Sequence, residues 1–201
     1  MGQYYKACLI REDSDGYGHP SYYSTYQTRE GAKLTEFSWV RGAFMNGICG
    51  MLYKDGLGFS EKDEFKVPRV AFIGDYWESA KVNEDWRLAC ALAWHSYGDV
   101  MNESIPLSSN MPYAWRNEYA KPVYFVNRDK DEYFAIEPDD YVNGELNPLG
   151  ILCAVGNGLG GGDYKGTRMD LVGRWAFDHI EAVTEEPTDL YKTSADFTEE
   201  Y

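Results

Sequence analysis

The chain has 201 residues, of which 44% are hydrophobic and 26% are charged. These fractions are close to those of ordinary globular proteins, so they exclude wholesale disorder. The sequence has no apolar run long enough for a membrane-spanning helix, and its start lacks the apolar segment of a secretory signal. We therefore expect a single α+β domain over residues 1–201, located in the cytoplasm, with an acidic tail from about residue 187.

The charge of the chain is strongly negative and unevenly distributed. Nineteen basic and thirty-three acidic residues give a net charge of -14. Residues 1–60 are balanced, whereas residues 121–201 contain seven basic and seventeen acidic residues, a net charge of -10. Such a surface repels phosphate and attracts basic partners, which predicts a basic protein partner and no direct binding of nucleic acid. The alternative is a solvated face that keeps the protein soluble and monomeric.

The cysteines give no sign of a metal site or a disulfide framework. Cys8, Cys49, Cys90 and Cys153 are far apart in the sequence, and each has apolar neighbours. Zinc sites need ligand pairs at short spacing, and none is present. We expect buried, reduced thiols in a reducing compartment and no bound metal.

Sequence patterns predict an N-terminal hairpin, then a helix and a buried strand. Residues 4–10 and 22–28 have the composition of two antiparallel strands. Apolar residues recur every three or four positions over 37–53, which predicts the first principal helix. Residues 66–75 contain a run of Val, Ala, Phe and Ile that is typical of a buried strand.

The middle of the chain predicts a second helix and a second hairpin. Residues 84–97 follow a good N-cap residue and precede a glycine stop, so we expect the second principal helix there. Prolines interrupt residues 98–120, which are expected to be irregular. Residues 122–127 and 133–136 are predicted to pair through a charged turn. The expected domain therefore has a mixed or antiparallel sheet and two principal helices.

Three segments complete the chain. The acidic stretch 137–147 is predicted to be a loop, and the short apolar run 149–155 is predicted to be a strand. Residues 171–183 fit either a helix or a strand, and we favour a strand near 178–184.

Aromatic side chains and paired acids mark a candidate interaction surface. Aromatic residues make up 16% of the chain, and seventeen of them are Tyr. Tyrosine is amphipathic and loses little entropy on contact, so it suits binding surfaces. A tyrosine cluster among Gly, Ser and Thr is either partly exposed or the core-facing side of a strand. The expected interaction surface consists of Tyr22, Tyr23, Tyr26, Asp139, Asp140, Glu185 and Glu186.

A glycine-rich stretch over residues 156–166 is the alternative candidate site. Its glycines formally match G-x-G-x-x-G, but further glycines oppose the helix that a dinucleotide site requires, so no cofactor is predicted. The exposed N–H groups of such a loop can instead line an anion nest. The competing interpretation is a tightly folded surface loop that needs positive φ. A ligand site here would use Gly156, Asn157, Gly158, Gly160, Gly161, Gly162, Asp163, Lys165, Arg174, Asp75 and His95.

The sequence contains no recognised catalytic constellation. Its three histidines lie in no metal-binding motif, and no serine lies in a nucleophile-elbow motif. Asp75 follows a predicted buried strand, where a working carboxylate is often found, but a carboxylate that only bonds the next turn is the more ordinary explanation. We therefore assign no catalytic residue.

Four sequence blocks resemble a set of uncharacterised small proteins of bacteria and their phages. The blocks are residues 1–6, 33–39, 69–76 and 157–164, which are spread over most of the chain. The resemblance implies no catalytic residues, because no activity is known for the set. It implies a phage or mobile-element setting, in which small acidic proteins often inhibit host defence complexes.

Three functions from different classes follow from these observations. The favoured one is a non-catalytic, tyrosine-rich acidic module that docks on a basic, nucleic-acid-handling host defence protein as a phage-type inhibitor. The second is a small-ligand or nucleotide-binding protein, with or without hydrolytic activity, that uses residues 156–166. The third is a structural protein that oligomerises through small residues of the first principal helix.

Overall fold

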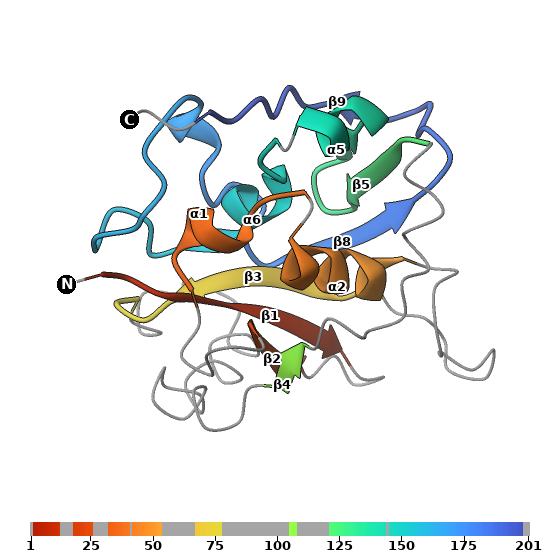
Figure 1. Ribbon diagram of the computed structural model, residues 1–201. Helices are drawn as coiled ribbons and strands as arrows, with labels where there is room; N and C mark the ends of the chain where they lie inside the picture. The colour runs from red at the N-terminus through yellow and green to blue at the C-terminus, as the bar shows by residue number, and fades with distance from the viewer. Residues whose placement is uncertain are drawn as a thin grey trace.

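The computed structural model describes residues 2–12, 18–25, 32–40, 42–53, 67–77, 105–107, 121–143 and 145–198. These residues form one mixed sheet of nine strands with short helices, which confirms the α+β class (Figure 1). The strand order is β4-β2-β1-β3-β8-β5-β6-β9, and β7 pairs with β3 away from this path. The predicted helix over 84–97 lies outside the described residues.

The N-terminal half of the sheet is built around β1 (Tyr5–Glu12). Strand β1 pairs antiparallel with β2 (Gly18–Thr25) and with β3 (Arg69–Gly74), which confirms the predicted hairpin and buried strand. Residues 5–10 are all buried because both faces of β1 are covered. Strand β4 (Ile105–Leu107) pairs parallel with β2, so the expectation that 98–120 is wholly irregular was wrong. A proline is tolerated in β4 because it is an edge strand.

Strand β8 (Asp178–Val183) joins the two halves of the sheet. Its first residues pair antiparallel with β3, and its last residues pair antiparallel with β5 (Val123–Asn127). Strand β5 forms the predicted hairpin with β6 (Glu132–Ile136). The strand expected near 178–184 is therefore confirmed, and it carries the sheet continuously from β1 to the C-terminal hairpin.

The first principal helix is shorter than predicted. The chain forms α1 (Leu34–Phe37) and then α2 (Ala43–Leu52) in place of one helix over 37–53. Between them, Trp39 forms a β-bridge with Leu146, and the Val40 N–H donates to the Glu145 carbonyl at 3.1 Å. These long-range backbone bonds replace the helical ones between α1 and α2. The apolar periodicity of the sequence runs through residues 37–53 without a break, so it gave no sign of this interruption.

Two further elements differ from expectation. Residues 137–147 are not only a loop, because α5 (Pro138–Asn143) forms there, with the Asp140 carboxylate accepting from the Glu137 N–H at 2.7 Å. The run 149–155 is not one strand but α6 (Pro148–Leu152) followed by β7 (Ala154–Val155). In α6, Asn147 is the N-cap and a proline occupies the first turn, which both favour a helix start.

The main core lies between the sheet and helices α1, α2 and α6. Trp175, Phe72, Phe125, Phe134 and Ile48 are among its fully buried side chains. Figure 1 shows these three helices on the same side of β3. The sequence-predicted burial of Cys8, Cys49 and Cys153 is confirmed, and all three are free thiols. None of the helices in the described ranges is long and apolar enough to cross a membrane.

The acidic tail is tied to the domain. Strand β9 (Tyr191–Lys192) pairs parallel with β6, and Phe197 is buried against Tyr164. Between β8 and β9 the chain runs through an acidic turn, and after β9 it follows the upper edge of the molecule in Figure 1. The 3-10 helix η3 (Met169–Leu171) lies in the connection to β8.

Candidate functional site

The glycine-rich loop is closed around one of its own carboxylates. Asp163 is buried and accepts hydrogen bonds from the Gly158 N–H at 2.7 Å, the Gly160 N–H at 2.9 Å and the Tyr5 hydroxyl at 2.7 Å. Gly158 has a φ of 97°, a conformation that a side chain would strain. Two backbone N–H groups of the loop therefore already bind an anionic group, which is the chain's own Asp163 carboxylate.

A second set of bonds fastens the loop to itself and to the N-terminus. The Asn157 side-chain oxygen accepts from the Tyr164 N–H at 2.8 Å, and its amide group donates to the Tyr164 carbonyl at 3.2 Å. The Gln3 N–H donates to the Gly161 carbonyl at 2.5 Å. These bonds favour the tightly folded loop over a vacant phosphate cradle.

Only part of the predicted ligand site comes together. Asp75 lies near the loop, where its carboxylate accepts from the Tyr4 N–H at 3.1 Å. Burial raises the pKa of Asp75, and the charge of Asp163 adds to the effect, although hydrogen bonds from backbone N–H groups oppose it. Arg174 is directed elsewhere, to an ion pair with Glu132. Lys165 is exposed at the surface, and His95 lies outside the described residues.

The sequence did not single out Gln3 or Tyr5, which pack directly beneath this loop. Gln3 is fully buried, and among the described residues neither polar atom of its side-chain amide has a hydrogen-bond partner. A Cβ at Gly74 would lie 1.8 Å from the Gln3 side-chain nitrogen, so the amide is packed directly against the backbone at the end of β3. Burial, followed by the hydrogen bond to Asp163, raises the pKa of Tyr5. Both residues support the loop instead of offering a reactive group.

Basic side chains of the C-terminal half form ion pairs with carboxylates of β8. Arg128 pairs with Glu181, and Lys130 pairs with Asp178. Nearby, Asp129 accepts from the His179 ring at 3.0 Å. Partial burial opposes ionisation of Asp129, but the hydrogen bonds and charge of His179 and the charge of Arg69 outweigh it and lower its pKa. This side of the domain is close to electrically balanced.

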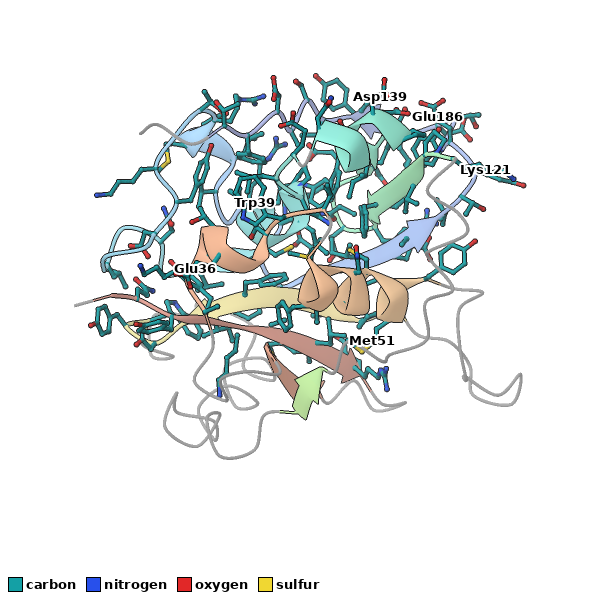
Figure 2. All side chains as sticks on the ribbon, viewed as in Figure 1. Glu36, Trp39, Met51, Lys121, Asp139 and Glu186 are labelled. Atoms are coloured by element: carbon teal, nitrogen blue, oxygen red, sulfur yellow. The ribbon has the colours of Figure 1, made fainter. Side chains whose placement is uncertain are left out.

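The remaining carboxylates gather on another part of the surface. Figure 2 labels Asp139, on α5, and Glu186, in the turn after β8, toward the upper right of the molecule. The Tyr133 hydroxyl donates to the Glu186 carboxylate at 2.8 Å, which fixes the turn after β8 beside β6. Among the residues that the structure describes, seven carboxylates of this region have no ion pair: Asp139, Asp140, Glu145, Glu185, Glu186, Asp189 and Asp196.

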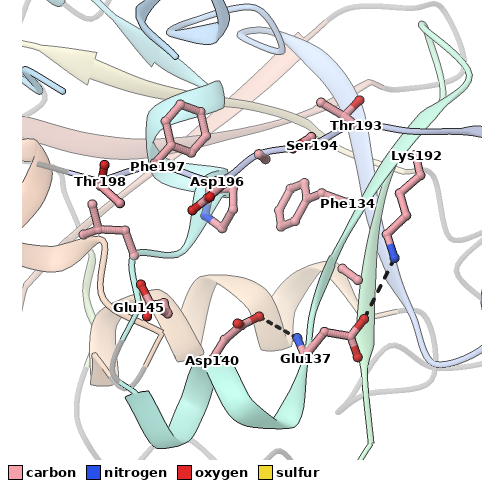
Figure 3. Close-up of a pocket in the computed structure, with 14 residues that line it drawn as sticks. Phe134, Glu137, Asp140, Glu145, Lys192, Thr193, Ser194, Asp196, Phe197 and Thr198 are labelled. Atoms are coloured by element: carbon pink, nitrogen blue, oxygen red, sulfur yellow. Dashed lines mark hydrogen bonds and ion pairs between the residues drawn. The ribbon is translucent and has the colours of Figure 1, made fainter. Parts of the chain in front are cut away.

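An acidic groove opens between α5 and the C-terminal segment (Figure 3). Its volume is about 440 Å³, within the range typical of ligand sites. Buried Phe134, Leu146 and Phe197 provide apolar lining. One lysine lines it, Lys192, 4.0 Å from Glu137. The acidic groove is hereafter the space lined by Phe134, Ala135, Glu137, Asp140, Glu145, Leu146, Pro148 and residues 192–198.

A second hollow of about 560 Å³ lies under the turn that follows β8. Glu185, Glu186 and Asp189 line it together with Arg128 and apolar side chains such as Val126. It extends the negative surface, but three carboxylates and one cation line it, against four carboxylates and one cation in the acidic groove, so the acidic groove carries the larger negative charge.

The predicted interaction residues divide into three groups. Asp140 lines the acidic groove, and Asp139 lies beside it on α5. Glu185 and Glu186 line the second hollow. Tyr22 and Tyr23 lie in β2, where the described structure gives the backbone alone, and Tyr26 lies outside the described residues.

Sequence reasoning missed most of the acidic groove. Glu137, Glu145 and Asp196 are brought together by the parallel pairing of β6 with β9, which places the tail opposite α5. The high net charge of residues 121–201 was the available signal, but it did not specify which acids converge.

The described residues provide no metal centre, since no group of three or more His, Cys, Asp or Glu among them is arranged to hold a metal ion. No protein-family model matches this chain, and no curated protein and no solved structure matches it either.

Proposed function

We propose that this protein is a non-catalytic acidic module that binds a basic polypeptide segment in the acidic groove. The observation that carries the proposal is the gathering of carboxylates, four of which line a groove with apolar side chains at its base; three of these four, Asp140, Glu145 and Asp196, have no ion pair among the described residues. Lysine and arginine have aliphatic stems and cationic ends, so they match both the apolar lining and the charged rim. A nucleic-acid backbone would be repelled.

The resemblance of the sequence to phage proteins directs the proposal to one class of partner. A host defence protein that handles nucleic acid must present a basic surface to hold phosphate. An acidic module that occupies this surface would act as a phage-type inhibitor by competing with the nucleic acid. Long-range attraction would speed the encounter, and the binding would weaken as salt screens the charges.

The first test measures binding of fluorescent hexalysine by anisotropy at low ionic strength. Glu145→Gln combined with Asp196→Asn removes two groove charges and is expected to weaken binding by about fivefold to thirtyfold, since exposed charge pairs contribute up to about 1 kcal/mol each. The matched control is Asp131→Asn with Asp189→Asn, which removes two exposed charges outside the groove lining.

The control variant is expected to bind within about twofold of the original protein, because its lost charges act only at long range. Equal weakening in both double variants would show that net charge, and not the groove, attracts the peptide. Absence of hexalysine binding at low ionic strength would overturn the proposed function.

A further inference from the structure

The segment after β9 keeps an extended course while it leaves the sheet. Along residues 193–198 the side chains alternate between inside and outside: Thr193 and Phe197 are buried, whereas Ser194, Asp196 and Thr198 are exposed. A two-residue alternation is the signature of an extended strand. We name residues 193–198 the C-terminal strap.

The backbone groups of the strap alternate as well. The Thr193 N–H donates to the Tyr133 carbonyl of β6 at 2.7 Å. On the opposite side, the Asp196 carbonyl accepts from the Thr167 hydroxyl at 3.1 Å, and the Thr198 carbonyl accepts from the Thr167 N–H at 3.1 Å. Backbone groups two residues apart in an extended chain point the same way. The N–H groups of residues 195 and 197 therefore point toward the β6 side, like that of residue 193.

These two N–H groups face the acidic groove without a partner. Within the described parts of the chain, the N–H groups of Ala195 and Phe197 donate no hydrogen bond. Strand β6 stops pairing with the tail after Tyr133 and continues into α5, so the two chains diverge and the groove occupies the space between them. Unpaired edge groups of this kind accept an added strand.

From this geometry we propose that the partner binds as one extended strand, inserted along the C-terminal strap with its carbonyls accepting from the Ala195 and Phe197 N–H groups. This inference rests on the proposed function and names its recognition mode, which is strand addition. Main-chain bonds fix the strand, while Glu145 and Asp196 attract its cationic side chains. Apolar or small residues at the alternate positions would face Phe134 at the base of the groove (Figure 3).

The charge arrangement favours a peptide strand over a compact cation. Glu137 and Asp140 belong to the α5 side of the groove, whereas Asp196 belongs to the strap side. Carboxylates on both sides of an elongated space match cations spaced along a chain. A partner sequence in which Lys or Arg alternates with Val, Ile or Thr would satisfy both the rim and the base of the groove.

The test uses the hexapeptide Lys-Val-Lys-Val-Lys-Val and two analogues with the same charge, one N-methylated at the valines and one at the lysines. In an extended peptide the N–H and the carbonyl of one residue point to the same side, so one of the two analogues places its methyl groups against the strap. Those methyl groups keep the peptide carbonyls out of reach of the Ala195 and Phe197 N–H groups without changing the side chains. At least one analogue is expected to bind at least about tenfold more weakly, because two or more main-chain bonds are lost. The bound peptide is also expected to protect the Ala195 and Phe197 amides from hydrogen exchange.

Two variants of the protein test the same inference independently of the peptide analogues. Ala195→Pro removes an N–H that faces the groove, whereas the control Thr188→Pro removes one in the turn between β8 and β9, outside the groove lining. We expect Ala195→Pro to weaken binding of the unmodified peptide about tenfold and Thr188→Pro to change it less than twofold. The peptide analogues remain informative if a proline disturbs the strap.

The outcomes separate this inference from the function on which it rests. Equal binding of all three peptides, with no protection of the Ala195 and Phe197 amides, would overturn strand addition while hexalysine binding preserved the acidic-module proposal. Protection at the strap together with the loss on N-methylation supports strand addition. Failure of every basic peptide to bind would overturn both.

Discussion

Asp163→Ala is expected to lower the free energy of unfolding by about 2–4 kcal/mol. Removing this carboxylate leaves the buried Tyr5 hydroxyl and the N–H groups of Gly158 and Gly160 without their acceptor. Bonds to a charged acceptor are stronger than neutral ones, and a buried donor that loses its partner incurs a desolvation cost. The free energy is measured by urea denaturation, and opening of the loop by proteolysis within residues 156–163.

The neighbouring Lys165→Ala variant is the control, because Lys165 is exposed and its loss should change stability by less than about 0.5 kcal/mol. Unchanged stability and unchanged protease resistance in Asp163→Ala would contradict the conclusion that this carboxylate holds the loop. A loop whose N–H groups already bind the Asp163 carboxylate has those groups occupied and cannot offer them to a phosphate. The nucleotide-site hypothesis stays a prediction that this geometry does not favour.

Glu132→Ala is expected to lower the free energy of unfolding by about 2–4 kcal/mol and to weaken binding in the acidic groove. Glu132 is nearly buried and pairs with Arg174, while accepting from the Trp175 indole N–H at 3.1 Å and the Thr193 hydroxyl at 3.3 Å. These contacts join β6 to the start of the C-terminal strap. Losing them leaves buried donors unpaired and releases one side of the groove.

Glu132→Gln keeps an acceptor for one of these donors and is therefore expected to lose less stability than Glu132→Ala. Asp170→Asn is the matched surface control, because Asp170 is largely exposed and water screens its pairing with Arg168. Thermal unfolding checks the stability of all three variants. If Glu132→Ala matched Asp170→Asn in both stability and hexalysine affinity, the anchoring role of Glu132 would be disproved.

The strands were predicted well because their patterns report burial directly. Apart from Lys6, residues 5–10 are apolar on both faces because β1 has a paired strand on either side, and the charged turn between β5 and β6 separates two clear strand patterns. The helix over 37–53 was placed too early because its period ignores the bridge between Trp39 and Leu146. The local sequence pattern carries no information about a backbone pairing with a residue more than one hundred positions away.

The run 149–155 was assigned to the wrong type of secondary structure. A short apolar segment is compatible with a buried strand or a buried helix, and the deciding feature was Asn147 capping a helix that starts with proline. The same limit applies to the acidic groove. Composition identified the acidic half of the chain, but the convergence of Glu145 with Asp196 depends on β9 pairing with β6, which is a tertiary event.

The central claim is that basic polypeptide binds in the acidic groove and not elsewhere on this acidic surface. The most direct measurement is a titration of the isotope-labelled protein with hexalysine, followed residue by residue through amide chemical shifts. The account predicts that the largest changes occur in residues 134–148 and 192–198. Changes that are spread evenly over the acidic residues, or that centre on residues 156–166, would contradict it.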